Sequence, residues 1–536
     1  MKKALCLFLS SIGLFLTFAA RSQSPNPLYQ HLPPNADHIT EINYNQINSK
    51  GNLGAVLNAL PPMHDPKADL VVGILKDPGS AGIDLSHNVV MASKAATGDG
   101  ADTLTFTNII MQLSDSARFR TAFTTAFSGV HLHRSPGKAT TASSAKDKFG
   151  IAWNDKVVIL TIASRDALSA LENKPAPAAG PHRSSAELAL EKSVAALAGF
   201  TGTPWENDPR FLSGFATDED VHFWSTGFNF GAFMSKFMSK MNKNSVDMKR
   251  LSTMMNVASK YPKPIVLSTF NFGNGKIEYH MTTFNTADNA AAMKAMLDQP
   301  FNKDLLARVP DGLLLGFVTA HMNPAAVEGL MDKYGTRAMA DSLLARSGLT
   351  VDDIVAPFTG DIMVAAVATD STITADSSKK KVKFYFAAGI KDPSRLMALG
   401  AKLAAMMPAT TGSGKPSPFA GLKDKMLIKD NLLIVSSSKE DAEHYANNTN
   451  RRSTDLLGDN NAMMKMVVDL KAVGSLLGSS MSGDPKMMIA SRLLDRLDKI
   501  IFTNGVMEGD NMTADFQITT GDPATNSLQT LLGIMH

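Results

Sequence analysis

The sequence predicts an α+β protein built from two similar halves, each an antiparallel sheet with helices packed on one face. The first observation is that strand-like stretches come in pairs joined by short connections, such as Val89–Ala92 with Leu104–Leu113 and Ile362–Ala368 with Val382–Gly389. The second is that helix-like stretches lie between sets of strands, an order typical of an antiparallel sheet. The third is a composition of 44% hydrophobic and 19% charged residues, which is ordinary for a globular protein with a sizeable core.

The second half of the sequence repeats the first at a nearly constant spacing, which is the pattern expected of an internal duplication. The clearest repeat compares residues 151–167 with residues 426–442. Each copy reads as a strand, a two-residue turn (Asn154-Asp155 and Lys429-Asp430), a second apolar strand and the start of a helix. Three anchor pairs lie 276, 275 and 277 residues apart, namely Pro34 with Pro310, Asp155 with Asp430, and Asp115 with Asp392.

The spacing then shortens to 240 residues, between Ala232 and Ala472, so the first half is expected to carry an insertion. Residues 174–205 supply it. They include a predicted helix, Ser184–Ala198, that begins with a capping box formed by Ser184 and Glu187. With the boundary between halves near Pro300, after a helix-like stretch, the predicted organisation is residues 1–22, 23–300 and 301–536.

Residues 1–22 have the pattern of a secretory signal peptide. Lys2 and Lys3 precede an apolar run from Ala4 to Ala20, and small residues follow, so cleavage is expected between Ser22 and Gln23. Its removal takes away three basic residues and leaves 50 basic and 50 acidic ones. This balance gives no electrostatic footprint for nucleic acid, and no other stretch is apolar enough for a transmembrane segment. The one cysteine, Cys6, lies within the signal, so no disulfide, thiolate ligand or lipid anchor is expected after cleavage.

Three short segments resemble an uncharacterised family of Bacteroidota cell-envelope proteins, domain of unknown function 4836. They are Leu32–Asp37, Gly82–Ser86 and Phe358–Asp361, each before a strand-like stretch. The resemblance covers most of the chain and implies an envelope location, in the periplasm or the outer envelope, but no activity. Many members look like lipoproteins, and this chain departs from them because no cysteine stands at the cleavage site.

Three segments resemble metal-binding patterns. His131 and His133 would lie on one face of a strand, as zinc or copper ligands do; we interpret them as surface histidines. Asp99–Asp102 and Asp218–Asp220 lack the alternating oxygen ligands and the distal acid of a calcium loop. We interpret both as solvated loops, and we expect no metal and no cofactor.

The catalytic patterns are incomplete. Thr411–Pro416 resembles a phosphate loop, but its first glycine is missing and Pro416 stands where a hydroxyl should hold magnesium. Ser143 and Lys146 have a Ser-x-x-Lys spacing without the companion motifs of penicillin-binding enzymes. The sequence therefore gives no catalytic residue to assign.

Methionine is abundant, and Met234, Met238 and Met241 share one predicted helical face. Such a face forms core in most proteins, but it can also line a pliable apolar groove or bind copper(I). Three functions remain open. The chain is a non-catalytic binding or scaffold module of the envelope, a carrier of a lipid-like apolar ligand, or an envelope hydrolase whose site the sequence does not reveal; its partner would be an envelope protein, a glycan or a lipid.

Overall fold

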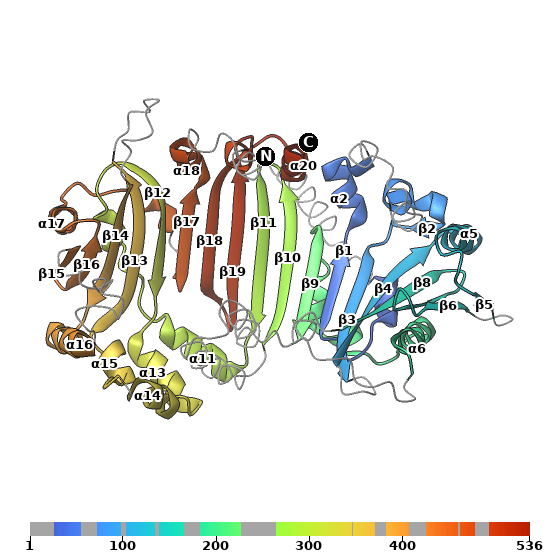
Figure 1. Ribbon diagram of the computed structural model, residues 1–536, viewed down its shortest axis with the longest axis horizontal. Coiled ribbons are helices and arrows are strands. Elements are labelled where there is room, and N and C mark those ends of the chain that lie inside the picture. Colours follow the sequence, from blue (N-terminus) through green and yellow to red (C-terminus); the bar gives the residue numbers. More distant parts are fainter. Residues whose placement is uncertain are drawn as a thin grey trace, which may run out of the picture. The chain divides into compact units, whose positions relative to one another are not determined.

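The computed structural model describes residues 26–535 except 55–71, 98–102, 135–138, 166–182, 227–263, 346, 370–381, 407–424, 459–460 and 478–491 (Figure 1). The chain divides into two compact units, Met1–Ser225 and Thr226–His536. The expected signal peptide and the methionine face of Met234, Met238 and Met241 lie outside the described residues. Within the described part, no helix is long and apolar enough to cross a membrane.

Unit 1 is built on one antiparallel sheet. Its strands pair in the order β9–β1–β3–β4–β8–β7–β6–β5, and the short β2 pairs with the end of β4. The elements are η1 (Pro27–His31), β1 (His38–Ile42), α2 (Tyr44–Gly51), η2 (Pro78–Ala81), β2 (Ile83–Asp84), β3 (Val89–Thr97), β4 (Thr103–Leu113), α5 (Ser116–Ala126), β5 (His133–Arg134), β6 (Thr140–Ser144), β7 (Phe149–Trp153), β8 (Val157–Arg165), α6 (Ser185–Ala198), α7 (Pro204–Asn207), α8 (Pro209–Gly214) and β9 (Val221–Thr226).

Strands β7 and β8 are covered on both faces, so the prediction of helices on one face is wrong for unit 1. On one face, Phe119 and Phe123 of α5 pack against Trp153 of β7. On the other, α6 lies so close to β7 that a side chain at Gly150 would meet the backbone of Leu190 at 2.1 Å. This second helix belongs to the predicted insertion, and its capping box of Ser184 and Glu187 is present.

Unit 2 is built on a longer antiparallel sheet, with the order β10–β11–β19–β18–β17–β12–β13–β14–β16–β15. Its elements are β10 (Ile265–Gly273), β11 (Lys276–Phe284), α11 (Ala287–Met296), α12 (Asp304–Ala307), β12 (Leu313–His321), α13 (Pro324–Lys333), α14 (Arg337–Ala345), α15 (Val351–Val355), β13 (Phe358–Ala368), β14 (Val382–Ile390), α16 (Pro393–Met406), β15 (Met426–Lys429), β16 (Leu432–Ser436), α17 (Lys439–Asn447), η6 (Asp455–Leu457), β17 (Met464–Asp469), α18 (Leu470–Leu477), β18 (Leu497–Glu508), β19 (Asn511–Thr520) and α20 (Ser527–Met535).

The main core of unit 2 lies on one face of strands β12, β13, β14, β16 and β17, which we call the core face. Phe317, Met363 and Tyr385 from these strands pack there with Leu305 of α12 and Tyr445 of α17. Neighbouring residues of a strand point to opposite faces. The residues that directly precede and follow Phe317, Met363 and Tyr385 along their strands therefore point to the other side of the sheet. We call that side the groove face.

The predicted strands and hairpins are observed within a few residues. Asn154 and Asp155 lie in the turn between β7 and β8. In the second hairpin the turn residues are Asp430 and Asn431, one position later than expected, and both have positive φ angles of 52° and 56°. Both turns join strands that pair in an antiparallel hairpin.

The pairing order also recurs between the units. The six strands β9–β1–β3–β4–β8–β7 of unit 1 pair in the same sequential order as β17–β12–β13–β14–β16–β15 of unit 2. The compact units meet at Ser225 and Thr226. Residues 226–300, which the sequence assigns to the first half, therefore lie in unit 2, where β11 pairs with β19.

Candidate functional site

The candidate site is an apolar groove on the groove face of unit 2. It has a volume of about 480 Å³ and lies over β17, β12, β13 and β14. Ligand pockets in proteins span about 300 to 1,000 Å³. The residues that line it are all apolar: Leu315, Gly316, Val318, Val364, Ala366, Val382, Phe384, Met466, Val468, Val473 and Leu476. Phe317 and Ala365, which belong to the core on the opposite face, also border it.

The floor of the groove is low because two small residues stand opposite each other. Gly316 of β12 pairs with Ala366 of β13, after an irregularity in the register of these strands. A side chain at Gly316 would meet the carbonyl oxygen of Val467 at 2.7 Å, so the close approach of β17 requires glycine there. Larger neighbours on the same face, Val468 and Phe384, form the two sides.

One end of the groove is closed by α18, through Val473 and Leu476. This helix follows β17 directly, and the carboxylate of Asp469 accepts a hydrogen bond of 2.7 Å from the backbone N–H of Ala472. Satisfying a free N–H in the first turn stabilises a helix start. The wall of the groove is thus fixed to the strand that forms part of its floor.

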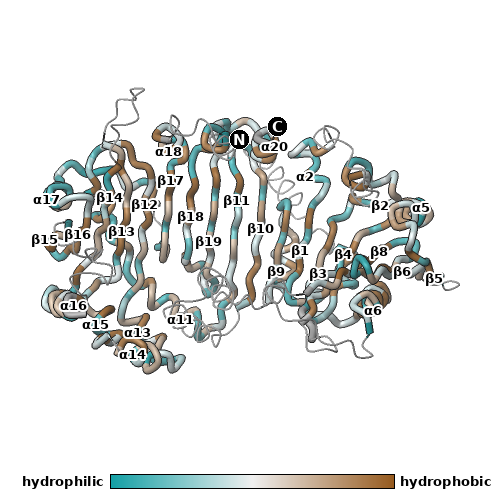
Figure 2. Tube along the Cα trace, in the orientation of Figure 1, coloured by the Kyte–Doolittle hydropathy of each residue, from teal (hydrophilic) through white to brown (hydrophobic). Residues whose placement is uncertain are grey.

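An apolar row continues from the groove across the sheet to the edge strand β15. Directly paired residues place Met466, Val318, Val364, Phe386, Val435 and Met426 side by side on six successive strands. Five strand spacings make this row roughly 24 Å long. Figure 2 shows hydrophobic residues recurring along these strands.

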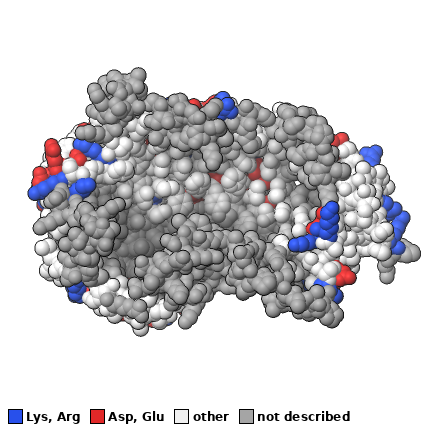
Figure 3. All heavy atoms as spheres, in the orientation of Figure 1, with Lys and Arg blue, Asp and Glu red and all other residues white. Residues whose placement is uncertain are grey.

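The row and the groove beside it are partly open to solvent. Val364 and Met426 of the row are each 41% exposed, and Phe384 at the side of the groove is 58% exposed. Scattered exposed apolar residues are normal on protein surfaces, but a contiguous set beside a groove is typical of a binding site. In Figure 3, charged atoms gather over α17 at the outer end of unit 2, where Lys439 and Glu443 lie.

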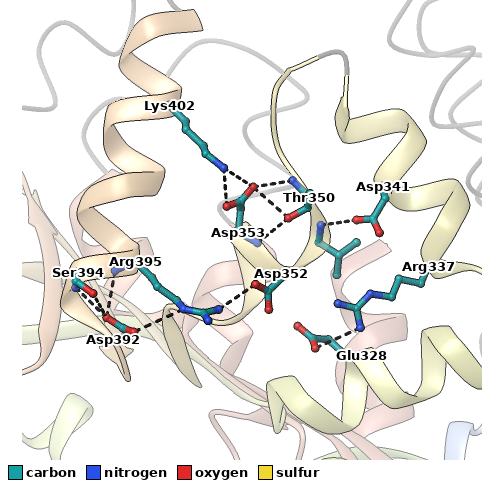
Figure 4. Close-up of polar contacts among 11 residues, drawn as sticks. Glu328, Arg337, Asp341, Thr350, Asp352, Asp353, Asp392, Ser394, Arg395 and Lys402 are labelled. Carbon is teal, nitrogen blue, oxygen red and sulfur yellow. Dashed lines mark hydrogen bonds and ion pairs between the residues drawn. The ribbon is translucent and has the colours of Figure 1, made fainter.

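A network of charged residues joins helices α13 to α16 (Figure 4). Arg395 binds Asp352 at 2.9 Å, and Lys402 binds Asp353 at 2.7 Å. The Lys402 ammonium group is the main cause that lowers the pKa of Asp353. Because these pairs face solvent, they contribute little to the free energy of unfolding, and we interpret them as contacts that orient the helices.

Unit 1 contains a buried polar cluster that the sequence did not indicate. The carboxylate of Glu41 on β1, 2% exposed, accepts hydrogen bonds from the hydroxyl of Tyr29 at 2.6 Å and from the amides of Asn26 at 2.8 Å and Asn88 at 3.1 Å. Burial raises the pKa of Glu41, and these three hydrogen bonds oppose the rise. Since its acceptors are occupied by the fold itself, we interpret the cluster as structural.

A second buried pair lies in unit 2. Nδ1 of His321 on β12 and Oδ1 of Asp361 on β13 are 2.8 Å apart, and the backbone N–H of Asn302 donates to the same oxygen at 3.1 Å. Burial would raise the pKa of Asp361, but hydrogen bonds from His321 and Asn302 hold it below its usual value. This pair anchors the segment that precedes α12.

The residues singled out from the sequence do not assemble into a site. His131 and His133 are exposed, and across the described residues no three His, Cys, Asp or Glu side chains are grouped so that they could hold a metal ion. Asp220 is fully buried and pairs with Lys50 at 2.9 Å, which is a structural role rather than that of a calcium loop.

Ser143 lies on β6, where it pairs with Gly150 of β7. The segments Asp99–Asp102 and Thr411–Pro416 lie outside the described residues. The sequence did not indicate the groove, because its floor depends on the pairing of Gly316 with Ala366, which lie 50 positions apart.

Comparisons with known proteins add little. No family model matches the sequence, and no curated protein matches it. Two solved structures are similar to part of it. One, titled "Structure of crystal form III of TP0453", is 12% identical with a TM-score of 0.28 and covers 51% of this chain and 88% of that chain. The other, crystal form I of TP0453, is 9% identical with a TM-score of 0.26 and covers 50% and 81%. At these TM-scores the likeness supports no conclusion about fold or function.

Proposed function

We propose that this protein is a non-catalytic binding protein of the cell envelope that carries an apolar, chain-like ligand in the groove of unit 2. The observation that carries the proposal is the groove of about 480 Å³, whose lining residues are all apolar. Of the three functions that the sequence leaves open, the carrier is the one that such a groove favours.

The shape of the surface favours a chain over a compact ligand. The apolar row from β17 to β15 is roughly 24 Å long, whereas one leaflet of a bilayer is about 15 Å of hydrocarbon. A long acyl chain lying across the strands would bury Val364, Phe384 and Met426, which are otherwise exposed. Its polar end would remain outside, because no polar side chain lines the groove.

We also propose that the two units arose by internal duplication. The pairings Ile151–Leu160 in unit 1 and Met426–Val435 in unit 2 coincide when both strands are shifted by 275 residues. The shared order of six strands supports it further. We infer that two related modules diverged, and that the module ending the chain carries the ligand.

The export signal and the resemblance to envelope proteins support an envelope location. Secretion into an aqueous compartment fits a carrier, because an acyl chain needs a protein to cover it in water. Location is tested by separating cell fractions and sequencing the N-terminus of the purified protein; a chain that still begins at Met1 in the cytoplasmic fraction would contradict this part of the proposal.

The decisive experiment fills the groove. Ala366→Trp places a large side chain on its floor, and Ala398→Trp, on an exposed position of α16, is the matched control. Protein isolated from its native envelope is analysed by native mass spectrometry, and the delipidated protein is titrated with a fluorescent fatty acid. We expect a copurifying apolar molecule and saturable binding for wild type and Ala398→Trp, and loss of both for Ala366→Trp.

The scaffold alternative predicts a different outcome. No copurifying molecule, together with fatty-acid binding that is equal in wild type and Ala366→Trp, would contradict the carrier and leave the scaffold. A series of fatty acids of increasing length then tests the chain-like ligand, since affinity should rise with each methylene by up to about 0.8 kcal/mol until the row is filled.

A further inference from the structure

A second apolar row lies beside the first on the groove face of unit 2. The row described above, from Met466 to Met426, borders the groove, and we call it the first row. Two positions along each of the same six strands, direct pairing places another set of side chains next to one another. This second row consists of Met464, Ala320, Ile362, Ala388, Leu433 and Ile428.

The spacing between these rows suits a hydrocarbon chain. Residues two positions apart on one face of a strand are separated by roughly 6.8 Å. Apolar carbon atoms attract one another best at about 3.5 to 4.0 Å, so a chain lying between two rows contacts both of them. The groove lies between the first row and the neighbouring row of Gly316 and Ala366. The first and second rows border another such space, which we call the second furrow.

The second furrow is bordered by apolar side chains that are open to solvent. Ile362 and Ile428 of the second row are 41% and 37% exposed, and Val364 and Met426 of the first row are each 41% exposed. Exposed apolar side chains gathered in one place are typical of a binding surface. A single chain in the groove would leave Ile362 and Ile428 in water, because neither residue lines it.

We propose that the ligand is a lipid with two hydrocarbon chains, one in the groove and the other in the second furrow. This inference rests on the proposed function and names the class of its ligand. Chains roughly 6.8 Å apart can start from one head group. Val473 and Leu476 of α18 close one end of the groove, so the head group lies toward β15.

Tethering explains how a shallow furrow contributes to binding. A free chain in the second furrow would lose its translational freedom for a small gain in buried surface. A chain joined to one that already lies in the groove pays no separate cost of association, because its effective concentration at the furrow is high. We therefore expect the second furrow to strengthen the binding of two-chain lipids only.

Two soluble phospholipids test the second chain: dioctanoyl phosphatidylglycerol and its one-chain counterpart, octanoyl lysophosphatidylglycerol. Each is titrated against delipidated protein that carries a fluorescent fatty acid, and displacement gives its affinity. For wild type, the two-chain lipid should bind about 10-fold more tightly or better. Ile362→Asp, which places a charge in the second furrow, should remove this advantage and leave the affinity of the one-chain lipid unchanged.

Ile354→Asp is the matched control, because Ile354 lies on α15 and is 39% exposed, close to the value for Ile362. It should keep the two-chain advantage of wild type. If Ile362→Asp does not fold, Ile428→Asp makes the same change at the β15 end of the furrow.

The outcomes separate this inference from the proposed function. Equal affinities of the two lipids for wild type, or a two-chain advantage that persists in the folded furrow variant, would overturn the second chain and leave the groove as a carrier of one chain. Failure of wild type to bind the fluorescent fatty acid would contradict the proposed function itself, and this inference with it.

Discussion

The hairpin β7–β8 of unit 1 and the hairpin β15–β16 of unit 2 have the same register but opposite exposure. Ile151 and Trp153 of β7 are 2% and 1% exposed, whereas Met426 and Ile428, 275 positions later on β15, are 41% and 37% exposed. The pairing register is alike, so we compare the side chains of the helices that follow β4 and β14.

The helices that follow β4 and β14 differ in that volume. Both begin with an aspartate cap, Asp115 and Asp392, whose carboxylates accept hydrogen bonds from backbone N–H groups of the first turn. In α5, the ring of Phe123 packs against that of Trp153 at a tilted angle, with 5.7 Å between the ring centroids. The residue of α16 that is 277 positions after Phe123 is Gly400, and a side chain there would meet nothing within 4 Å. The first hairpin is covered by aromatic rings, whereas the second keeps exposed apolar residues.

The largest expected effect comes from breaking the sealed hairpin. Trp153→Ala should lower the free energy of unfolding of unit 1 by about 3 to 5 kcal/mol, because it removes a fully buried aromatic side chain. Urea unfolding followed by tryptophan fluorescence measures it, since Trp205 and Trp224 remain in unit 1. Ile428→Ala is the matched change in unit 2 and should cost less than about 1 kcal/mol by circular dichroism. Equal costs would show that the two hairpins do not differ as described.

The second-largest expected effect is a difference between the two units in how their stability depends on pH. Burial lowers the pKa of His222 in unit 1 from 6.5 to about 4. Because the folded value lies below the unfolded one, this contribution to stability is complete above pH 6.5 and is lost as pH falls toward about 4, by about 3 kcal/mol in total. In unit 2 the pKa of Asp361 is lowered below 3.8, so its contribution is lost only below that pH.

Unfolding measured at several pH values for wild type and His222→Gln isolates the histidine. Glu41, the cross-strand partner of His222, has a raised pKa and acts in the opposite direction, so the difference between wild type and variant is the informative quantity. A difference that stays constant between pH 7 and 4 would rule out the role assigned to His222.

A smaller effect on stability is expected from a substitution in α16 of unit 2. Gly400→Ala should raise the free energy of unfolding of unit 2 by roughly 0.5 to 1 kcal/mol, since glycine is unfavourable inside a helix and space is open at this position. Thermal unfolding followed by circular dichroism detects the shift. Destabilisation would indicate that α16 packs more tightly than its exposed Met397 suggests.

The smallest effect is expected at the exposed histidines of unit 1. His131→Ala together with His133→Ala should change the free energy of unfolding by less than about 0.5 kcal/mol and leave metal content unchanged. Metal analysis of the purified protein checks this. Stoichiometric zinc or copper that the double variant loses would overturn the interpretation.

Local patterns predicted the elements well. The capping box at Ser184 and the paired strands around Asp155 and Asp430 depend on residues a few positions apart, and the structure has them. Periodicity could not show that α6 covers the second face of β7, because that contact requires the absence of a side chain at Gly150.

Local sequence patterns could not predict the candidate site. Gly316 and Ala366 have no meaning as a pair until the register of β12 and β13 is known, and the same holds for His321 and Asp361. A strand with a glycine in its middle was the only available signal, since glycine in a strand often marks a close approach of another backbone.

The pairing of β11 with β19 has a consequence for the order in which the protein is made. Lys276 pairs with Thr519, 243 residues later, whereas the farthest pairing between β1 and β9 of unit 1 joins His38 to Ser225. Contacts between distant residues form slowly because a long loop must close first. Unit 1 can complete its sheet once residue 226 has emerged, but β11 must wait with one edge unpaired until nearly the whole chain exists. Folding of the unit 2 sheet is thereby tied to the synthesis of β19.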